Sequence, residues 1–232
     1  MPALPDAVIL RFNPWWSDPA WELHDPHLEA LRERRVELEL ETFSADLPLS
    51  TPAVHVVRGP RQVGKSTALK KLIRRAVSAL GADAVVYLAF DELADRPIGD
   101  VTETVRSAKR LATGDERSAS LVVLDEVTAA RGWADAVKAL WDEGTMRRDV
   151  VVCTGSSAVD LHADAVERLP GRRGAGRDAL MLPASFAAFA RAGDSRIPAA
   201  PALDVAALVS PDGVELLRRS RRFLPALEVA AP

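Results

Sequence analysis

Cysteine is nearly absent from this 232-residue sequence, and long hydrophobic runs are missing altogether. The single Cys153 excludes an internal disulfide and a metal cluster built from cysteine thiolates, and we expect it to be buried. The longest mostly apolar stretch, ALMLPASFAAFA, is too short to cross a bilayer. The first residues lack the basic region of a secretory signal peptide. We therefore expect a cytoplasmic protein without a membrane segment.

A large excess of either charge is missing as well. The formal net charge is −3, and only five of the 30 basic residues are lysines. Such a balance provides no overall attraction to a polyanion. A nucleic-acid partner is therefore unsupported. Hydrophobic residues make up 48% of the chain, which is enough for the core of a globular domain.

Short apolar runs alternate with stretches of helical length from residue 51 onward. We expect strands over 53–57, 84–90, 120–126 and 149–155, with a weaker one over 178–184. The expected helices cover 65–80, 98–113, 133–144 and 157–169. Because the strands are apolar without alternation, the pattern predicts a parallel sheet covered on both faces. It divides the chain into an irregular or helical N-terminal arm (1–50), an α/β domain (51–191) and a partial lid or linker (192–232).

A glycine-rich segment follows the first of these strands. The spacing Gly59-x-x-x-x-Gly64-Lys65-Ser66, between a strand and a helix, is typical of a loop that binds the phosphates of a nucleotide. Glycine lets the backbone wrap around the anion, and the first N–H groups of the helix face it. The predicted nucleotide-binding residues are Gly59, Pro60, Arg61, Gln62, Val63, Gly64, Lys65, Ser66 and Thr67.

Two acids end the strand expected over 120–126. At the carboxyl end of a parallel strand, Asp125 would hold Mg²⁺ together with Ser66, and Glu126 would deprotonate the attacking water. Lys65 would contact the β- and γ-phosphates. The tetrapeptide [NT]-K-x-D, with which GTPases recognise guanine, does not occur, so ATP is favoured over GTP.

Two further polar positions are candidates for the same site. Thr154 ends the fourth strand and would lie near the γ-phosphate, or it would belong to a plain turn capped by Ser156 or Ser157. The segment ERLPGRRGAGR contains an arginine cluster, which is either a solvated loop or the source of an arginine finger for a neighbouring molecule.

Tryptophans are concentrated near the N-terminus, at positions 15, 16 and 21. Aromatic rings stack on bases, so one hypothesis places them on the adenine. The favoured one has them pin the arm onto the edge of the sheet, where their large apolar surface is buried.

Five motifs agree in order with one known family. GPRQVGKST, LDE followed by GW, TGSS, ERLPGRRG and LMLPASF resemble the prokaryotic AAA+-type P-loop ATPases that carry a C-terminal domain of unknown function. The resemblance, which covers residues 9 to about 190, implies a three-layer α/β sandwich with sheet order 5-1-4-3-2. It also implies a catalytic role for Arg172 as arginine finger, with Arg173 as rival, and hence a homo-oligomer. This sequence is too short for the family's C-terminal domain.

The motifs together predict a Mg²⁺-dependent ATPase that acts as a molecular switch. Its catalytic candidates are Lys65, Glu126, Thr154 and Arg172, and its cofactors are ATP and Mg²⁺. The alternative is a nucleotide-binding interaction module with little or no hydrolysis.

Overall fold

The computed structural model describes residues 4–33, 43–91, 98–113, 119–130, 132–156, 169, 174–183 and 191–192. Nearly all of them belong to one compact unit, which comprises Met1–Arg32 and Glu41–Leu182. The other unit, Glu33–Leu40 and Pro183–Pro232, lies almost wholly outside the described residues. The domain boundaries at residues 50 and 191 stay a prediction.

Five parallel strands form the sheet at the centre of the molecule. Their order is β2-β3-β4-β1-β5, so the expected order 5-1-4-3-2 is confirmed. The strands of the interior are buried along nearly their whole length, as a sheet covered on both faces requires. Their bounds are β1 Ala53–Arg58, β2 Val85–Ala89, β3 Leu121–Asp125, β4 Val150–Gly155 and β5 Asp178–Leu180.

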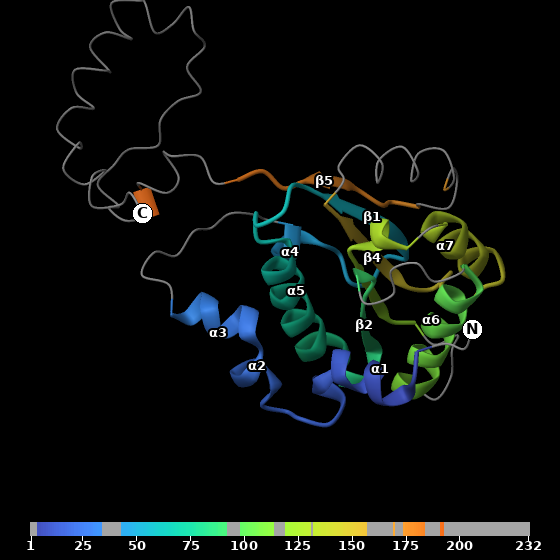
Figure 1. The fold of residues 1–232 in the computed structure, drawn as a ribbon, viewed down its shortest axis with the longest axis horizontal. Helices are drawn as coiled ribbons and strands as arrows, with labels where there is room; N and C mark the ends of the chain where they lie inside the picture. Colours follow the sequence, from blue (N-terminus) through green and yellow to red (C-terminus); the bar gives the residue numbers. More distant parts are fainter. Residues whose placement is uncertain are drawn as a thin grey trace, which may run out of the picture. The chain divides into compact units, whose positions relative to one another are not determined.

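Three long helices cover the two faces of this sheet. The chain crosses from β1 to β2 in one direction along the sheet and returns to β3 and β4 in the other. Because such crossovers are right-handed, helices that connect strands in opposite directions lie on opposite faces. Figure 1 shows α5 on one side and α6 with α7 on the other. Their bounds are α5 Lys65–Leu80, α6 Ile98–Thr113 and α7 Trp133–Asp142.

These elements agree with the helices expected over 65–80, 98–113 and 133–144. The helix expected over 157–169 lies almost wholly outside the described residues. No helix in the described part of the chain is long and apolar enough to cross a membrane. Cys153 is buried in β4, as expected. Short helical turns complete the fold at α4 Phe43–Asp46, η2 Ala82–Ala84 and η4 Val127–Ala129.

The N-terminal segment, residues 4–32, packs along the outer edge of β2. The indole N–H groups of Trp15 and Trp16 donate to Val85 O at 3.0 and 2.9 Å. Trp21 packs against Trp15, with ring centroids 5.1 Å apart. The expectation that tryptophans pin this segment to the sheet edge is therefore confirmed. Its helices are α1 Asp6–Phe12, η1 Pro14–Trp16, α2 Trp21–His24 and α3 Pro26–Arg32.

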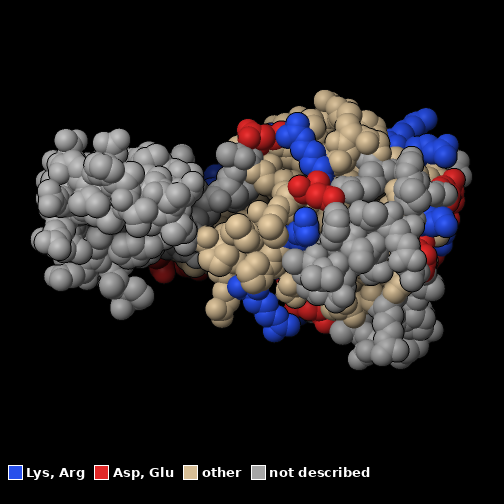
Figure 2. Space-filling view, turned by 90° about the horizontal axis from the view of Figure 1, so that it is seen from above, with Lys and Arg blue, Asp and Glu red and all other residues tan. Residues whose placement is uncertain are grey.

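Charged side chains of both signs are interspersed on the face shown in Figure 2. Lys and Arg lie beside Asp and Glu there, and the described residues of that face form no broad area of one sign. This distribution agrees with the small net charge of −3. The described part of this face therefore offers a polyanion such as nucleic acid no extended basic surface.

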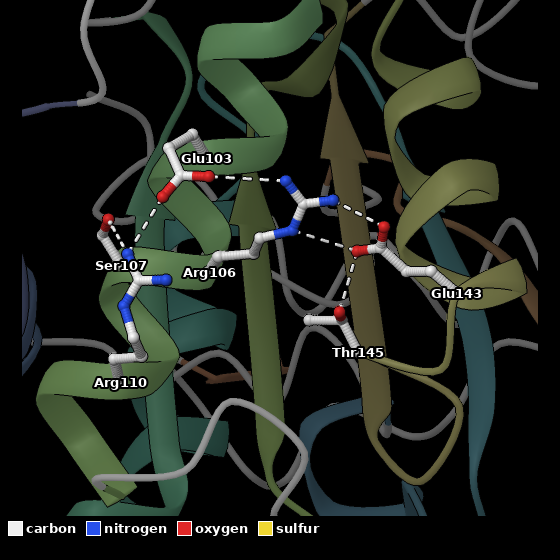
Figure 3. Close-up of polar contacts among 6 residues, drawn as sticks. All are labelled: Glu103, Arg106, Ser107, Arg110, Glu143 and Thr145. Atoms are coloured by element: carbon white, nitrogen blue, oxygen red, sulfur yellow. Dashed lines mark hydrogen bonds and ion pairs between the residues drawn. The ribbon is translucent and has the colours of Figure 1, made fainter.

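Two polar clusters join α6 to the rest of the domain. In the buried one, Lys109 Nζ lies 2.5 Å from Asp149 Oδ2, and both side chains are fully buried. The exposed one, drawn in Figure 3, links Arg106 to Glu143 through two hydrogen bonds of 3.1 and 2.5 Å and to Glu103 at 3.4 Å. The two clusters fix the same helix, but only the second is open to solvent.

Candidate nucleotide-binding site

The loop between β1 and α5, residues 59–64, needs glycine for two different reasons. Gly64 adopts φ 93°, a left-handed conformation, and a Cβ atom on it would meet nothing within 4 Å. Gly59 instead lies against neighbouring backbone, because a Cβ there would come within 2.3 Å of Met181 O. Gln62 also has a positive φ, of 65°. The tight turn is thus open on one side and supported by the end of β5 on the other.

The N-terminus of α5 presents backbone donors at this loop. Ala68 N–H donates to Gly64 O at 2.9 Å, and this bond joins the first turn of the helix to the loop. The preceding N–H groups, of Lys65, Ser66 and Thr67, have no acceptor within the helix. Together with the positive end of the helix dipole, they suit a bound anion.

Lys65 is held at the loop by its own neighbours. Its Nζ donates to Gly59 O at 2.9 Å and to Pro60 O at 3.0 Å. The same atom lies 3.4 Å from Glu126 Oε1. The lysine therefore brings a positive charge to the loop and lies beside one of the two acids that end the third strand.

The carboxylate of Asp125 accepts hydrogen bonds from three hydroxyl groups. Tyr87 Oη donates to Oδ2 at 2.9 Å, and Ser66 Oγ lies 3.3 Å from the same oxygen. Thr154 Oγ1 donates to Oδ1. Tyr87 and Thr154 belong to β2 and β4, which flank β3, so the carboxylate is fixed from both neighbouring strands.

Glu126 has an unusual backbone conformation for its residue type. Its φ of 52° is left-handed, which costs free energy in any residue other than glycine. Its N–H donates to Thr154 Oγ1 at 3.0 Å, and its Oε2 accepts from Ser156 N–H at 2.9 Å. The side chain stays 27% exposed. Thr154 thus holds the backbone of Glu126, and Ser156 holds its partly exposed carboxylate near Lys65.

These residues fit a nucleotide with Mg²⁺. Ser66 Oγ and Asp125 Oδ2 are hard oxygen ligands and lie 3.3 Å apart. No group of three or more His, Cys, Asp and Glu side chains that could hold a metal ion occurs among the residues described. Mg²⁺ does not need such a group, because substrate phosphates and water supply most of its ligands.

The comparison with protein families decides the class of this domain. Residues 51–190, more than half of the chain, match a family described as an AAA domain. The chain belongs to the AAA domain family. The matched range includes all five strands and the loop between β1 and α5. The N-terminal segment, residues 4–32, lies before the matched range.

Three solved structures resemble this AAA domain at low identity. The ORC2 protein of Aeropyrum pernix, in ADPNP and ADP complexes, is 14% identical with a TM-score of 0.45 and covers 61% of this chain. PCH-2 of C. elegans is 16% identical with a TM-score of 0.39 and covers 64%. A katanin structure that concerns self-assembly is 14% identical with a TM-score of 0.40 and covers 79%. This chain spans 45%, 41% and 73% of their respective lengths. No curated protein matches the sequence.

All nine residues expected to bind the nucleotide, 59–67, lie in the loop and the first turn of α5. Thr154 is fully buried, and its hydroxyl contacts Asp125 and the backbone of Glu126. Its contact with the γ-phosphate stays a prediction. The expected arginine finger Arg172 and its rival Arg173 lie outside the residues that the structure describes.

Tyr87 contacts the candidate site of the AAA domain, although the motifs did not identify it. Burial, followed by the nearby charge of Asp125, raises the pKa of the phenol far above its ordinary value. The hydroxyl therefore stays protonated and donates to Asp125. It is the chain's one tyrosine and lies inside an apolar run. The available signal was that a phenol in a buried strand needs a hydrogen-bond acceptor.

Proposed function

We propose that this AAA domain binds ATP together with Mg²⁺, hydrolyses it and acts as a molecular switch. The observation that carries the proposal is the convergence of a cation, a metal-ligand pair and a second acid at one end of the sheet. Lys65 Nζ lies 3.4 Å from Glu126 Oε1, and Ser66 Oγ lies 3.3 Å from Asp125 Oδ2. In a parallel α/β sheet, ligands bind at this end.

Each of these residues has a separate role in the proposal. Lys65 and the N–H groups of the loop neutralise the phosphates. Ser66 and Asp125 would hold the Mg²⁺, which would supply charge neutralisation at the transferred phosphoryl group. Glu126 is the base that orients and deprotonates the attacking water. Its 27% exposure and its fixed position support this role, because a general base must reach water and be held in place.

An arginine from a neighbouring subunit completes the site in this proposal. The family resemblance assigns Arg172, with Arg173 as rival. A finger supplied by a second molecule makes the turnover per molecule rise with protein concentration. Mixing Arg172→Ala with Lys65→Ala subunits should then restore activity, because the intact site of the first variant borrows the arginine of the second. If a proven monomer hydrolyses ATP equally well, the finger is not supplied in trans.

Calorimetry with ATP and Mg²⁺ tests the proposed function directly. The unmodified chain should bind, and Lys65→Ala should lose detectable binding, because it removes the ammonium at the loop. Lys71→Ala is the matched control, since Lys71 lies on the same helix α5 beyond the loop. Equal affinities of Lys65→Ala and the unmodified chain would contradict the proposal. Binding without turnover at any protein concentration would identify a nucleotide-binding interaction module instead of an ATPase.

A further inference from the structure

We propose that Tyr87 is a positioning residue for Asp125, and that the N-terminal segment, residues 4–32, holds Tyr87 in the position that Mg²⁺-dependent nucleotide binding requires. This inference rests on the proposed function and assigns a role to residues outside the matched AAA domain, 51–190. It follows from an unbroken series of contacts between the segment and the acid.

The first contact fixes the acid itself. The 2.9 Å hydrogen bond from Tyr87 Oη is the closer of the two that reach Asp125 Oδ2, and Ser66 Oγ lies 3.3 Å away from that oxygen. Tyr87 thus reaches the same oxygen as Ser66, the other candidate Mg²⁺ ligand. Without the phenol hydroxyl, the carboxylate would keep the Thr154 contact and could rotate about it. The distance between the two Mg²⁺ ligands would then be less well defined.

The second set of contacts fixes the strand that carries Tyr87. The side-chain amide of Asn13 donates to Tyr87 O at 3.0 Å, and Tyr87 N–H donates to Asn13 Oδ1 at 2.7 Å. Asn13 therefore satisfies both backbone groups of Tyr87 on the outer side of β2, as a neighbouring strand would. The Phe12 ring meets the tyrosine ring edge to face, with centroids 6.3 Å apart. Backbone and ring are both held by the N-terminal segment.

The third set involves a buried ion pair. Lys70 Nζ lies 4.2 Å from the centroid of the Tyr87 ring and 5.5 Å from that of Trp15. It also lies 3.3 Å from Asp25 Oδ2, while Asp25 Oδ1 accepts from the N–H groups of Leu28 and His27 at the start of α3. The ammonium thus contacts the N-terminal segment and the tyrosine face at once. Burial lowers the pKa of Lys70, and the charge of Asp25 opposes this shift.

The experiment measures ATP binding by the full chain at increasing Mg²⁺ concentration. Tyr87→Phe keeps the ring and removes only the hydroxyl. We expect the Mg²⁺ concentration at half-maximal binding to rise about 3- to 10-fold, less than the full loss of one hydrogen bond to a charged group would give, because Thr154 still holds the carboxylate. ATP affinity in EDTA should stay the same, because the donors of the loop do not depend on Asp125. Asn13→Ala should shift the midpoint in the same direction by less.

Trp16→Phe is the matched control for a purely structural effect. It removes a hydrogen bond between the same segment and the same strand, but that bond reaches Val85 and not Tyr87. Thermal unfolding should show a loss of stability in all three variants. Only Tyr87→Phe and Asn13→Ala should change the Mg²⁺ midpoint.

The outcomes separate this inference from the proposed function. If the unmodified chain binds no ATP with or without Mg²⁺, the proposed function is wrong. If it binds, and Tyr87→Phe has the unmodified Mg²⁺ midpoint, the positioning role is wrong. Should Tyr87→Phe fail to fold, Asn13→Ala decides, because an unmodified midpoint there overturns the role of the N-terminal segment. An equal shift in Trp16→Phe would show a general loss of stability and would also overturn the inference.

Discussion

Two buried aspartates at opposite ends of the sheet have opposite surroundings. Asp149 directly precedes β4, where its Oδ2 lies 2.5 Å from Lys109 Nζ and its Oδ1 accepts two hydrogen bonds from Ser120. Asp125 ends β3, where three hydroxyl groups surround its carboxylate. Among the described residues, no lysine or arginine forms an ion pair with Asp125.

The difference separates an acid that stabilises the fold from one that is suited to a ligand. Burial raises the pKa of Asp149, and the charge of Lys109 opposes that shift. The negative charge of Asp149 is thus balanced inside the chain. The hydroxyl donors of Asp125 orient its carboxylate but bring no positive charge, and Mg²⁺ would supply one. The charge of Asp149 thus has a buried partner within the chain, whereas Asp125 has no ion pair among the described residues and interacts with the charge of Lys70 only at longer range.

The largest expected effect is a loss of stability at the amino end of the sheet. Lys109→Met keeps the length of the side chain and leaves the carboxylate of Asp149 buried without its partner. We expect the free energy of unfolding in urea to fall by about 3–5 kcal/mol, the usual range when one partner of a buried pair is removed. Asp149→Asn in the same chain should recover part of the loss, because it removes the uncompensated charge. A loss below about 1 kcal/mol would contradict this role of the pair.

Glu126→Gln tests the candidate site at the carboxyl end of the sheet through the rate of ATP hydrolysis. The amide keeps the shape of the side chain but does not take a proton from water, so ATP hydrolysis should fall by about 100-fold or more. ATP affinity should change little, because the loop and Lys65 remain. Turnover and calorimetry on the same preparation check both parts. Hydrolysis at the unmodified rate would show that another group acts as the base.

Asp125→Asn gives the direct counterpart of the change at Asp149. It removes a buried carboxylate that has no ion pair among the described residues but weakens its hydrogen bonds with three hydroxyl groups, so the free energy of unfolding in urea should fall by about 1–2 kcal/mol, less than in Lys109→Met. The increase in ATP affinity that Mg²⁺ produces should be lost. If Asp125→Asn destabilises the fold as strongly as Lys109→Met, the distinction between the two acids fails.

The sheet and the loop were predictable because their signals are local. Uninterrupted apolar runs separated by helical stretches placed β1 at 53–57 and β3 at 120–126, against the observed Ala53–Arg58 and Leu121–Asp125. The place of the loop between β1 and α5 follows from the spacing of its glycines, and its role in nucleotide binding stays a prediction. The proximity of Asp125 and Ser66, 59 positions apart, follows from the rule that parallel strands present their carboxyl ends at one edge.

The contacts that link Asn13 and Lys70 to Tyr87 were not predictable in the same way. Asn13 bonds to Tyr87 across 74 positions, and no local pattern connects the two. Lys70 lies in the second turn of the amphipathic helix α5, where a lysine is normally solvated. Its side chain is nevertheless buried beside Asp25. In the sequence, only the tryptophans of the N-terminal segment, with their large apolar surface, indicated that this segment packs against the sheet. Its polar partners depend on the tertiary structure.

The smallest expected effect concerns the exposed cluster of α6 drawn in Figure 3. Glu103 accepts from Arg110 at 2.9 Å and from Arg106 at 3.4 Å, and its side chain is 43% exposed. Water and salt screen such pairs, so Glu103→Gln should lower the free energy of unfolding by only about 0.2–1 kcal/mol. Raising the salt concentration should reduce this loss further, while the loss in Lys109→Met, on the same helix but buried, should stay nearly constant.

The pH dependence of Glu103→Gln provides a second test of the exposed cluster. The hydrogen bond from Arg110, with the weaker one from Arg106, lowers the pKa of Glu103 from its ordinary value of 4.5. A lowered pKa in the folded state means that the stabilisation is complete above pH 4.5 and is lost as the pH falls through the lowered value. The variant and the unmodified chain should therefore differ at neutral pH and converge in acid. A difference that stays constant with pH and salt would mean that Glu103 acts through packing, so exposure would not explain why this cluster is weaker than the buried pair.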